Sequence, residues 1–224
     1  MKENVKTNML TDTLVIDNIT IPYSKYKTIS ISCSGGADSS LLLYILMKYK
    51  QTGTIHVYTY ANNLKGRLAA KSSANVIEKC IQLTGYYDIA HHVLYVDKHD
   101  SKVMFSNLRL QKEITKSAIV YSATTANPPK DIADSFCGEH KNSEQQDRDP
   151  AIQRPTFISD TFCTPFTNIN KKKIKELYDY LGVTKSLFPI TRSCEGFKSK
   201  TENFTKTCNT CWWCLERKWA FETF

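Results

Sequence analysis

The stretch from Ile29 to Leu46 constrains the fold of this chain more than any other. Its first residues, Ile-Ser-Ile-Ser-Cys, alternate as a strand does, and its last residues form an apolar run suited to a helix. Between the two lie Ser34, Gly35 and Gly36, and adjacent glycines commonly mark a turn between two elements. We therefore expect a strand, a tight turn and a helix that starts near Ser39.

This turn is suited to binding a phosphate group. Two adjacent glycines permit backbone conformations that a Cβ would block, so several N–H groups can point into one concavity. The following helix adds its dipole and its free N-terminal amides. The lysine of a G-x-x-x-x-G-K-S/T loop is missing, so this is not the common NTPase loop. The groups expected to hold a pyrophosphate are the amides of Gly35, Gly36 and Ala37 and the hydroxyls of Ser34, Ser39 and Ser40.

Strands and helices alternate along the first half of the chain. We expect strands at 54–60, 91–96 and 117–124, helices at 66–84 and 102–115, and a hairpin or edge strand at 13–21 that Pro22 ends. This alternation predicts an α/β fold with a doubly wound, mostly parallel sheet. Ligands of such sheets bind beyond the carboxyl ends of the strands, so the loops after Cys33, Tyr60, Val96 and Thr124 should converge on one site. Tyr60 is included among the nucleotide-binding residues on this ground.

The character of the chain changes between residues 131 and 155. This segment is polar, mixed in charge and without periodicity, and it is either a linker or a loop that covers a substrate. Order returns with a helix that Asn170 caps and Gly182 ends. Three lysines, 171–173, occupy its first turn, where the helix dipole disfavours cations, so an anionic group nearby would offset that cost.

Four cysteines near the C-terminus have the spacing of a metal site. Cys194, Cys208, Cys211 and Cys214 follow the pattern C-x13-C-x2-C-x2-C. Four thiolates complete a tetrahedron and leave no open position, so we expect a structural zinc ion. An iron–sulfur cluster is the alternative, because C-x2-C-x2-C also resembles its ligand pattern. The remaining cysteines lack partners in sequence and are interpreted as structural. The adjacent histidines 91–92 are also interpreted as structural, since neighbouring strand residues point to opposite faces and cannot easily share one ion.

Composition limits the class of protein. With 224 residues, the chain has room for one α/β domain and a small appendage. No apolar stretch approaches the roughly 20 residues that span a bilayer, and the first eight residues lack the apolar core of a secretory signal. We expect a cytoplasmic protein without a membrane partner, in which cysteines are thiols or metal ligands. The net charge of +8 suits anionic partners, but the lysines are scattered and a solvated basic surface explains most of it.

Ser34-Gly35-Gly36-Ala37-Asp38-Ser39 resembles the SGGxDS signature of the PP-loop ATP pyrophosphatases. Members of that superfamily split ATP between its α- and β-phosphates, generally to adenylate a substrate that a nucleophile then attacks. Further matches follow in order and make the chain, from about Thr28 to Phe221, similar to the 7-cyano-7-deazaguanine synthase family. These matches are Thr164-Pro165, Asn170-Lys171, Thr191-Arg192-Ser193-Cys194 and Cys208-x2-Cys211-x2-Cys214-x2-Arg217.

The resemblance implies a reaction and roles for individual residues. The carboxylate of 7-carboxy-7-deazaguanine would be adenylated by ATP, converted by ammonia to the amide, then activated again and dehydrated to the nitrile. Lys171 matches the family's lysine after Thr-Pro and would contact a phosphate. On chemical grounds, Asp38 is assigned as the Mg²⁺ ligand and Arg192 is placed at the same anion as Lys171. Asp38, Ser39 and Lys171 are the expected catalytic residues. Zinc would be structural.

Two domains and several alternatives follow from the sequence. Residues 1–190 are assigned to the ATP-binding domain, with 131–155 as its candidate substrate loop, and 191–224 to the zinc-binding segment.

The stretch 60–66 and the segment 131–155 depart from the family pattern, so the product is either the nitrile or the amide. The other interpretations are a tRNA-modifying sulfur transferase of the same superfamily, a related enzyme recruited to DNA or protein modification, and a non-enzymatic zinc module that binds nucleic acid. Nucleic acid is not expected as a partner, and a homodimer is compatible with the sequence.

Overall fold

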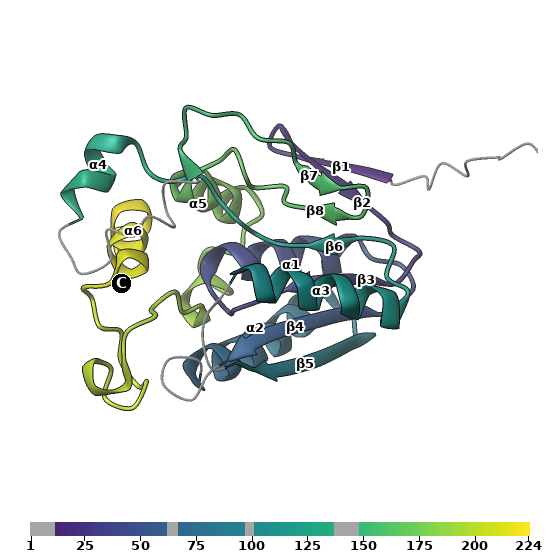
Figure 1. The fold of residues 1–224 in the computed structure, drawn as a ribbon, viewed down its shortest axis with the longest axis horizontal. Coiled ribbons are helices and arrows are strands. Elements are labelled where there is room, and N and C mark those ends of the chain that lie inside the picture. Colours follow the sequence, from purple (N-terminus) through teal and green to yellow (C-terminus); the bar gives the residue numbers. More distant parts are fainter. Residues whose placement is uncertain (1–11, 62–66, 97–100, 137–147) are drawn as a thin grey trace, which may run out of the picture.

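A six-stranded sheet forms the centre of the fold (Figure 1). The computed structural model describes residues 12–61, 67–96, 101–136 and 148–224, and in this part of the chain the strand order is β5-β4-β3-β6-β8-β7. Neighbouring strands from β5 to β8 are parallel, and β7 pairs antiparallel with β8 at the edge. The strands are β3 (Ile29–Ser32), β4 (Ile55–Ala61), β5 (Ile89–Tyr95), β6 (Val120–Tyr121), β7 (Phe157–Ser159) and β8 (Phe162–Cys163).

Helices cover both faces of this sheet, which confirms the predicted doubly wound α/β class. Successive residues of β4 point in opposite directions: the Thr59 hydroxyl bonds to Ser73 of α2, whereas Tyr60 bonds to Met104 of α3. None of the described helices is both long and apolar enough to span a bilayer. The helices are α1 (Ala37–Tyr49), α2 (Arg67–Thr84), α3 (Ser101–Thr115), α4 (Lys130–Ser135), α5 (Lys171–Tyr180) and α6 (Trp212–Phe221), with short 3-10 turns η2 (Phe188–Ile190) and η3 (Lys198–Lys200).

The chain reverses its winding direction at β3. From β3 it proceeds to β4 and then β5 on one side, and it returns through α3 to place β6 on the other side of β3. A crevice for ligands forms at the carboxyl ends of the strands where such a reversal occurs. The glycine turn that follows β3 is therefore located at the topological switch point of the sheet.

Helix α1 lies at the centre of the core. Every residue from Ala37 to Met47 except Asp38 is buried, as expected for a helix that is apolar on all sides. The Tyr178 hydroxyl of α5 donates to the carbonyl oxygen of Ala37 at 2.8 Å and so fixes the first turn of α1. Consequently α1 and its preceding turn are held by packing from several directions.

The C-terminal helix belongs to the same packed unit. Helix α6 packs on α5, and its last residues, Ala220 and Phe221, join the main core together with Phe188. The rings of Phe188 and Phe221 stack with centroids 4.0 Å apart. The residues after 190 are thus attached to the α/β domain by apolar contacts in addition to their own cysteine cluster.

Three details of the strands differ from the sequence prediction. The predicted hairpin forms from β1 (Asp12–Ile16) and β2 (Ile19–Tyr23), but Pro22 lies inside β2 instead of ending it. An edge strand tolerates proline, because its N–H side needs no ladder partner. Strand β6 is only two residues long, and β7 and β8 were not predicted because pairs and triplets of residues are too short to show a period.

The predicted cap of α5 provides a test of this local structure. The Asn170 side chain accepts hydrogen bonds from the amides of Lys172 at 3.0 Å and Lys173 at 3.4 Å. We expect Asn170→Ala to lower the free energy of unfolding by about 1 kcal/mol, because it leaves these amides without that acceptor. Calorimetry should show a melting temperature about 2–4 °C lower, and Asn170→Asp, which keeps the acceptor, should not show it. Equal melting of all three proteins would contradict the assigned cap.

Candidate nucleotide and metal sites

The turn after β3 requires glycine at its first position. Gly35 has φ of +77°, a left-handed conformation that a side chain disfavours. A Cβ at Gly35 would lie 2.6 Å from backbone atoms of Ser72 and Ser73, so the turn touches α2 directly. Gly36 has an ordinary φ of −74°, and the nearest atom to a Cβ there is the Ser34 hydroxyl at 3.2 Å. The two glycines therefore serve different purposes: Gly35 permits a close approach, and Gly36 keeps the concavity open.

Serine hydroxyls hold this turn in shape. The Ser39 hydroxyl accepts from the Ser34 amide at 3.3 Å and donates to the Gly36 carbonyl at 3.3 Å. The Ser40 hydroxyl is buried and donates to the same carbonyl at 2.7 Å. Ser34 is exposed at the edge of the turn, and its hydroxyl accepts from the Gly36 amide at 3.3 Å. Of the three predicted serines, Ser34 is thus the one whose side chain faces solvent in the described structure.

A second segment closes the turn from the opposite side. The Arg192 amide donates to the Gly35 carbonyl at 2.8 Å, and the Ala37 amide donates to the Ser193 hydroxyl at 3.5 Å. The Arg192 side chain is exposed, so it is free to reach an anion at the rim of the site. Ser193 was not predicted as a site residue, although it lies between Arg192 and Cys194 in a matched stretch of sequence. Ser193 therefore contacts the glycine turn through its hydroxyl, next to the contact that the Arg192 amide makes.

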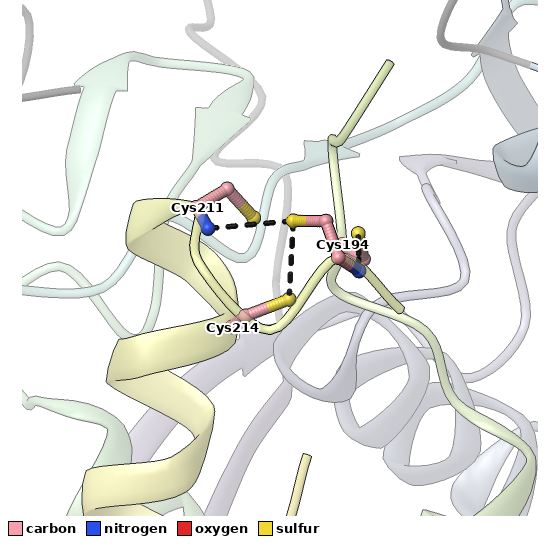
Figure 2. A group of neighbouring side chains, drawn as sticks. Cys194, Cys211 and Cys214 are labelled. Atoms are coloured by element: carbon pink, nitrogen blue, oxygen red, sulfur yellow. Dashed lines mark hydrogen bonds between the residues drawn. The ribbon is translucent and has the colours of Figure 1, made fainter. Parts of the chain in front are cut away.

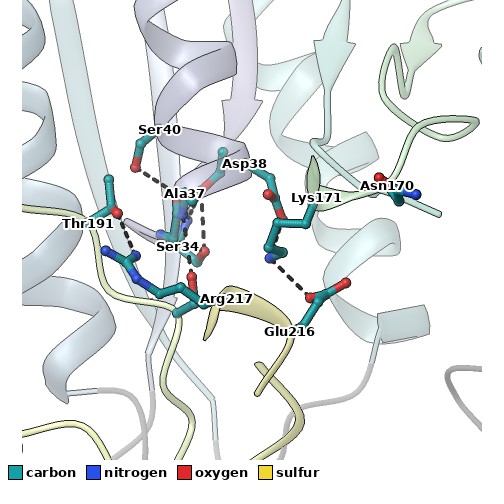
Figure 3. Close-up of polar contacts among 12 residues, drawn as sticks. Ser34, Ala37, Asp38, Ser40, Asn170, Lys171, Thr191, Glu216 and Arg217 are labelled. Carbon is teal, nitrogen blue, oxygen red and sulfur yellow. Dashed lines mark hydrogen bonds and ion pairs between the residues drawn. The ribbon is translucent and has the colours of Figure 1, made fainter. Parts of the chain in front are cut away.

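Three charged side chains from three helices meet beside the turn (Figure 3). The Lys171 ammonium of α5 lies 2.9 Å from Asp38 Oδ2 of α1 and 3.1 Å from Glu216 Oε2 of α6. Burial lowers the pKa of Lys171, but the two carboxylates outweigh this effect and the net shift is upward, so the ammonium stays charged. The anionic group expected near the lysine triplet is therefore a pair of carboxylates. Glu216 was not predicted as a site residue, because its neighbours in sequence give no indication that its carboxylate is buried.

Arg217 connects α6 to the segment that precedes the cysteines. Its guanidinium donates from Nη1 to the Thr191 hydroxyl at 2.7 Å and lies 4.0 Å from the centre of the Phe188 ring. Burial lowers its pKa to about 10, so it remains a cation at neutral pH. This contact orients α6 so that Glu216, one residue earlier, faces Lys171.

Tyr60 contacts helix α3 in the described structure. The Tyr60 side chain is buried against Leu108 of α3, and its hydroxyl donates to the Met104 carbonyl at 3.0 Å. Burial raises its pKa to about 12. The residues that follow it, 62–66, lie outside the described residues, as do 137–147 in the candidate substrate loop. The described start of that segment forms α4, whose neighbour Phe136 packs edge-on against Trp212 of α6 at 5.1 Å.

The four predicted cysteines lie together next to the start of α6, and Figure 2 shows three of them, Cys194, Cys211 and Cys214. Their sulfur atoms are all within 4.8 Å of one another, and those of Cys208 and Cys214 are 3.9 Å apart. A tetrahedron of thiolates at 2.3 Å from one ion spaces its sulfurs by about 3.8 Å. The thiols of Cys211 and Cys214 donate to Cys194 and lower its pKa, so a thiolate is favoured there. The described cluster therefore fits a single metal ion.

Backbone groups support the sulfurs, as expected around a metal site. The amides of Gly196 and Cys208 donate to the Cys194 sulfur at 3.3 and 3.2 Å, and the Cys211 amide donates to the Cys208 sulfur at 3.3 Å. A Cβ at Gly196 would lie 2.7 Å from the Cβ of Cys208, so only glycine fits between the two cysteine segments. Gly196 was not predicted, because a lone glycine carries no metal-binding signal in sequence.

Comparison with known proteins gives distant structural similarities. No protein-family model and no curated protein sequence matches the chain. A U34-tRNA thiolase from Methanococcus maripaludis, solved with its 4Fe–4S cluster, is 15% identical, with a TM-score of 0.43 over 81% of this chain and 66% of its own. An NH3-dependent NAD synthetase from Campylobacter jejuni subsp. jejuni is 11% identical, with a TM-score of 0.45 over 74% of this chain and 69% of its own.

A third structure of this group is an NMN synthetase from Francisella tularensis. It is 12% identical, with a TM-score of 0.43 over 88% of this chain and 77% of its own. At such distances none of these similarities identifies a reaction, a substrate or a cofactor for this chain. The functional argument therefore has to come from the residues and their geometry.

The two glycines of the turn allow a matched test. Gly35→Ala should lower the free energy of unfolding by about 2 kcal/mol or more, because the new side chain meets both a left-handed φ and the backbone of α2. Gly36→Ala should cost less than about 1 kcal/mol, because φ is ordinary and the nearest atom is a movable hydroxyl. Calorimetric melting of the two variants checks this order. If Gly36→Ala were the more destabilised protein, the close approach of residue 35 to α2 would not be the reason that this position requires glycine.

Proposed function

We propose that this protein is an ATP-dependent ligase that adenylates a carboxylate and transfers ammonia to it. The observation that carries the proposal is the glycine turn at the switch point of the sheet, with Asp38 and Lys171 paired beside it at 2.9 Å. A turn of this kind is suited to a pyrophosphate, and ligands of such sheets bind at this position. No lysine in the turn is directed at a terminal phosphate, which favours cleavage between the α- and β-phosphates.

The glycine turn and the side chains beside it provide groups for each part of the leaving pyrophosphate. Amides of the turn and of the first turn of α1 would hold its oxygens, together with the exposed hydroxyl of Ser34. Lys171 would contact a phosphate and Arg192 would approach from the rim. Asp38 fits a Mg²⁺ ligand, because its Oδ1 atom is buried and has no hydrogen-bond partner among the described residues. When bound, Mg²⁺ neutralises charge that builds up on the departing oxygens.

The reaction needs no nucleophile from the protein. An oxygen of the substrate carboxylate attacks the α-phosphorus and pyrophosphate leaves, which produces an acyl adenylate. Ammonia then attacks the acyl carbon, and AMP leaves with the former carboxylate oxygen. Adenylation turns a poor leaving group into a good one. The protein can therefore accelerate the second step mainly by positioning ammonia next to the acyl carbon.

The resemblance noted in the sequence supports 7-carboxy-7-deazaguanine as the acid. The amide oxygen would attack the α-phosphorus of a second ATP, and pyrophosphate would leave. The adenylated oxygen would then leave as part of AMP while the nitrogen loses its protons, which gives the nitrile, 7-cyano-7-deazaguanine. Two buried polar atoms are available to a polar ligand: Thr125 Oγ1, just beyond β6, and Trp212 Nε1 of α6. Neither has a hydrogen-bond partner among the described residues, and buried polar groups normally have one.

The metal proposed for the cysteine cluster is structural zinc. Sulfurs within 4.8 Å of one another favour one tetrahedral ion, since an iron–sulfur cubane separates its thiolates further than a single ion does. All four thiolates are used by the ion in this arrangement, so no position remains for chemistry. Its role would be to hold the start of α6 to the segment around Cys194.

Product analysis tests the reaction. With ATP, Mg²⁺, ammonium and 7-carboxy-7-deazaguanine, chromatography should show AMP and pyrophosphate, and mass spectrometry should show the amide followed by the nitrile. Without an acid, no AMP should form. Asp38→Asn should lower the rate by at least about a hundredfold, because the amide is a poor ligand for Mg²⁺. ADP as the main product, or turnover without acid, would refute the mechanism, and an amide that accumulates would indicate an enzyme that stops after the first step.

Elemental analysis tests the metal. The purified protein should contain about one zinc per chain, and Cys211→Ser should lower both the zinc content and the melting temperature because one ligand is lost. Cys80→Ser is the matched control: Cys80 is a buried thiol in the main core, outside the cluster, and its replacement should leave the zinc content unchanged. Iron in the protein, with absorption near about 400 nm, would show an iron–sulfur cluster instead.

A further inference from the structure

Glu216 is an unusual member of the charged cluster beside the glycine turn. Its side chain is 1% exposed, and it shares the Lys171 ammonium with Asp38, at 3.1 Å and 2.9 Å respectively. One ammonium thus faces two carboxylates. Among the described residues, Asp38 Oδ1 and both oxygens of Glu216 have no hydrogen-bond partner, so Glu216 Oε2 contacts Lys171 as an ion pair only.

Stability alone does not explain this second carboxylate. Lys171 already pairs with Asp38. The buried Arg217 guanidinium is held by the Thr191 hydroxyl and the Phe188 ring, and it forms no ion pair with Glu216 in the described structure. Burial of a further charge with unsatisfied oxygens is costly unless something compensates for it. A glutamine or an apolar residue at this position would avoid that cost. The retention of a full charge here indicates a task that a neutral side chain cannot perform.

Charge sharing is such a task. An ammonium that bonds only to Asp38 would neutralise the carboxylate and compete with any metal ion for it. With Glu216 present, the ammonium keeps a counter-ion when it is drawn away from Asp38, so the arrival of a divalent cation leaves no unpaired charge in the buried site.

We infer that Glu216 is a positioning residue that keeps Asp38 available to a divalent cation by sharing the Lys171 ammonium. This inference rests on the proposed ATP chemistry and adds a residue to it. It also gives the cysteine segment a function beyond folding, because Cys214 lies in the first turn of α6 two residues before Glu216. The cysteine cluster and the Arg217 contact together hold Glu216 against Lys171.

A binding measurement tests the inference without turnover. Mn²⁺ replaces Mg²⁺ as a paramagnetic probe, and α,β-methylene-ATP supplies a nucleotide that cannot be cleaved at the bond in question. Free Mn²⁺ is measured by electron paramagnetic resonance. Glu216→Gln, which has the same shape without the charge, should raise the Mn²⁺ dissociation constant about tenfold or more, the size expected for a change in a buried charge pair.

Two further variants separate charge from packing. Glu216→Asp keeps the charge and should retain most of the affinity, although its reach is shorter. Glu202→Gln is the matched control in the same C-terminal segment, where an exposed Glu202 pairs with Lys206 at 3.0 Å, and it should bind Mn²⁺ like the wild type. The zinc content and the melting temperature of each variant report whether α6 is still in place. If Glu216→Gln does not fold, Glu216→Met, which also lacks the charge, replaces it in the comparison with Glu216→Asp.

The outcomes distinguish this inference from the proposed function. The positioning role would be overturned if Glu216→Gln bound Mn²⁺ with wild-type affinity, or if Glu216→Gln and Glu216→Asp lost the same amount of Mn²⁺ affinity. In either case, AMP formation by the wild type would leave the proposed function intact. If the wild type bound no Mn²⁺ with the nucleotide and formed no AMP, the proposed function would fall and the inference with it. A loss in Glu216→Gln that Glu216→Asp largely restores would support the role of the charge.

Discussion

The contact of the buried Lys171 with the carboxylates of Asp38 and Glu216, of which Glu216 is fully buried, is the interaction on which the arrangement of the site depends. It joins α1, α5 and α6, three helices that come from distant parts of the chain. Breaking a buried ion pair by removing one partner typically costs about 3–5 kcal/mol, because the remaining charge is left uncompensated. The glycine turn, the helix that it starts and the cysteine segment are therefore coupled through one ammonium group.

A second constraint acts on the backbone. Gly35 permits the turn to touch α2, and the amide of Arg192 closes the turn from the other side with a bond to the Gly35 carbonyl. The same segment continues directly into Cys194, the first of the cluster cysteines. The cysteine cluster and the glycine turn are thus neighbours in the fold, although the residues that form them lie about 160 positions apart in sequence, as Ser34 and Cys194 illustrate.

Local signals explain which features of the fold were predictable. The strand before Gly35, the apolar α1, the cap at Asn170 and the spacing of the four cysteines each depend on a few consecutive residues, and each was found where expected. Short elements were missed for the same reason: β8, Phe162–Cys163, offers no period to detect. Tyr60 lies at the predicted end of its strand, but the face on which its ring lies was settled by packing against Leu108 of α3.

The sequence by itself determined the α/β class, the position of the glycine turn and the set of clustered cysteines, because these depend on residue type and short-range spacing. Only the tertiary structure decided that Glu216 faces Lys171, that Ser193 lines the turn and that Gly196 separates two cysteine segments. A buried ion pair or a close contact at a glycine depends on two segments that are distant in sequence. The residues of one segment give no information about which segment will pack against it. The partner of a buried side chain therefore becomes known only once the chain is folded.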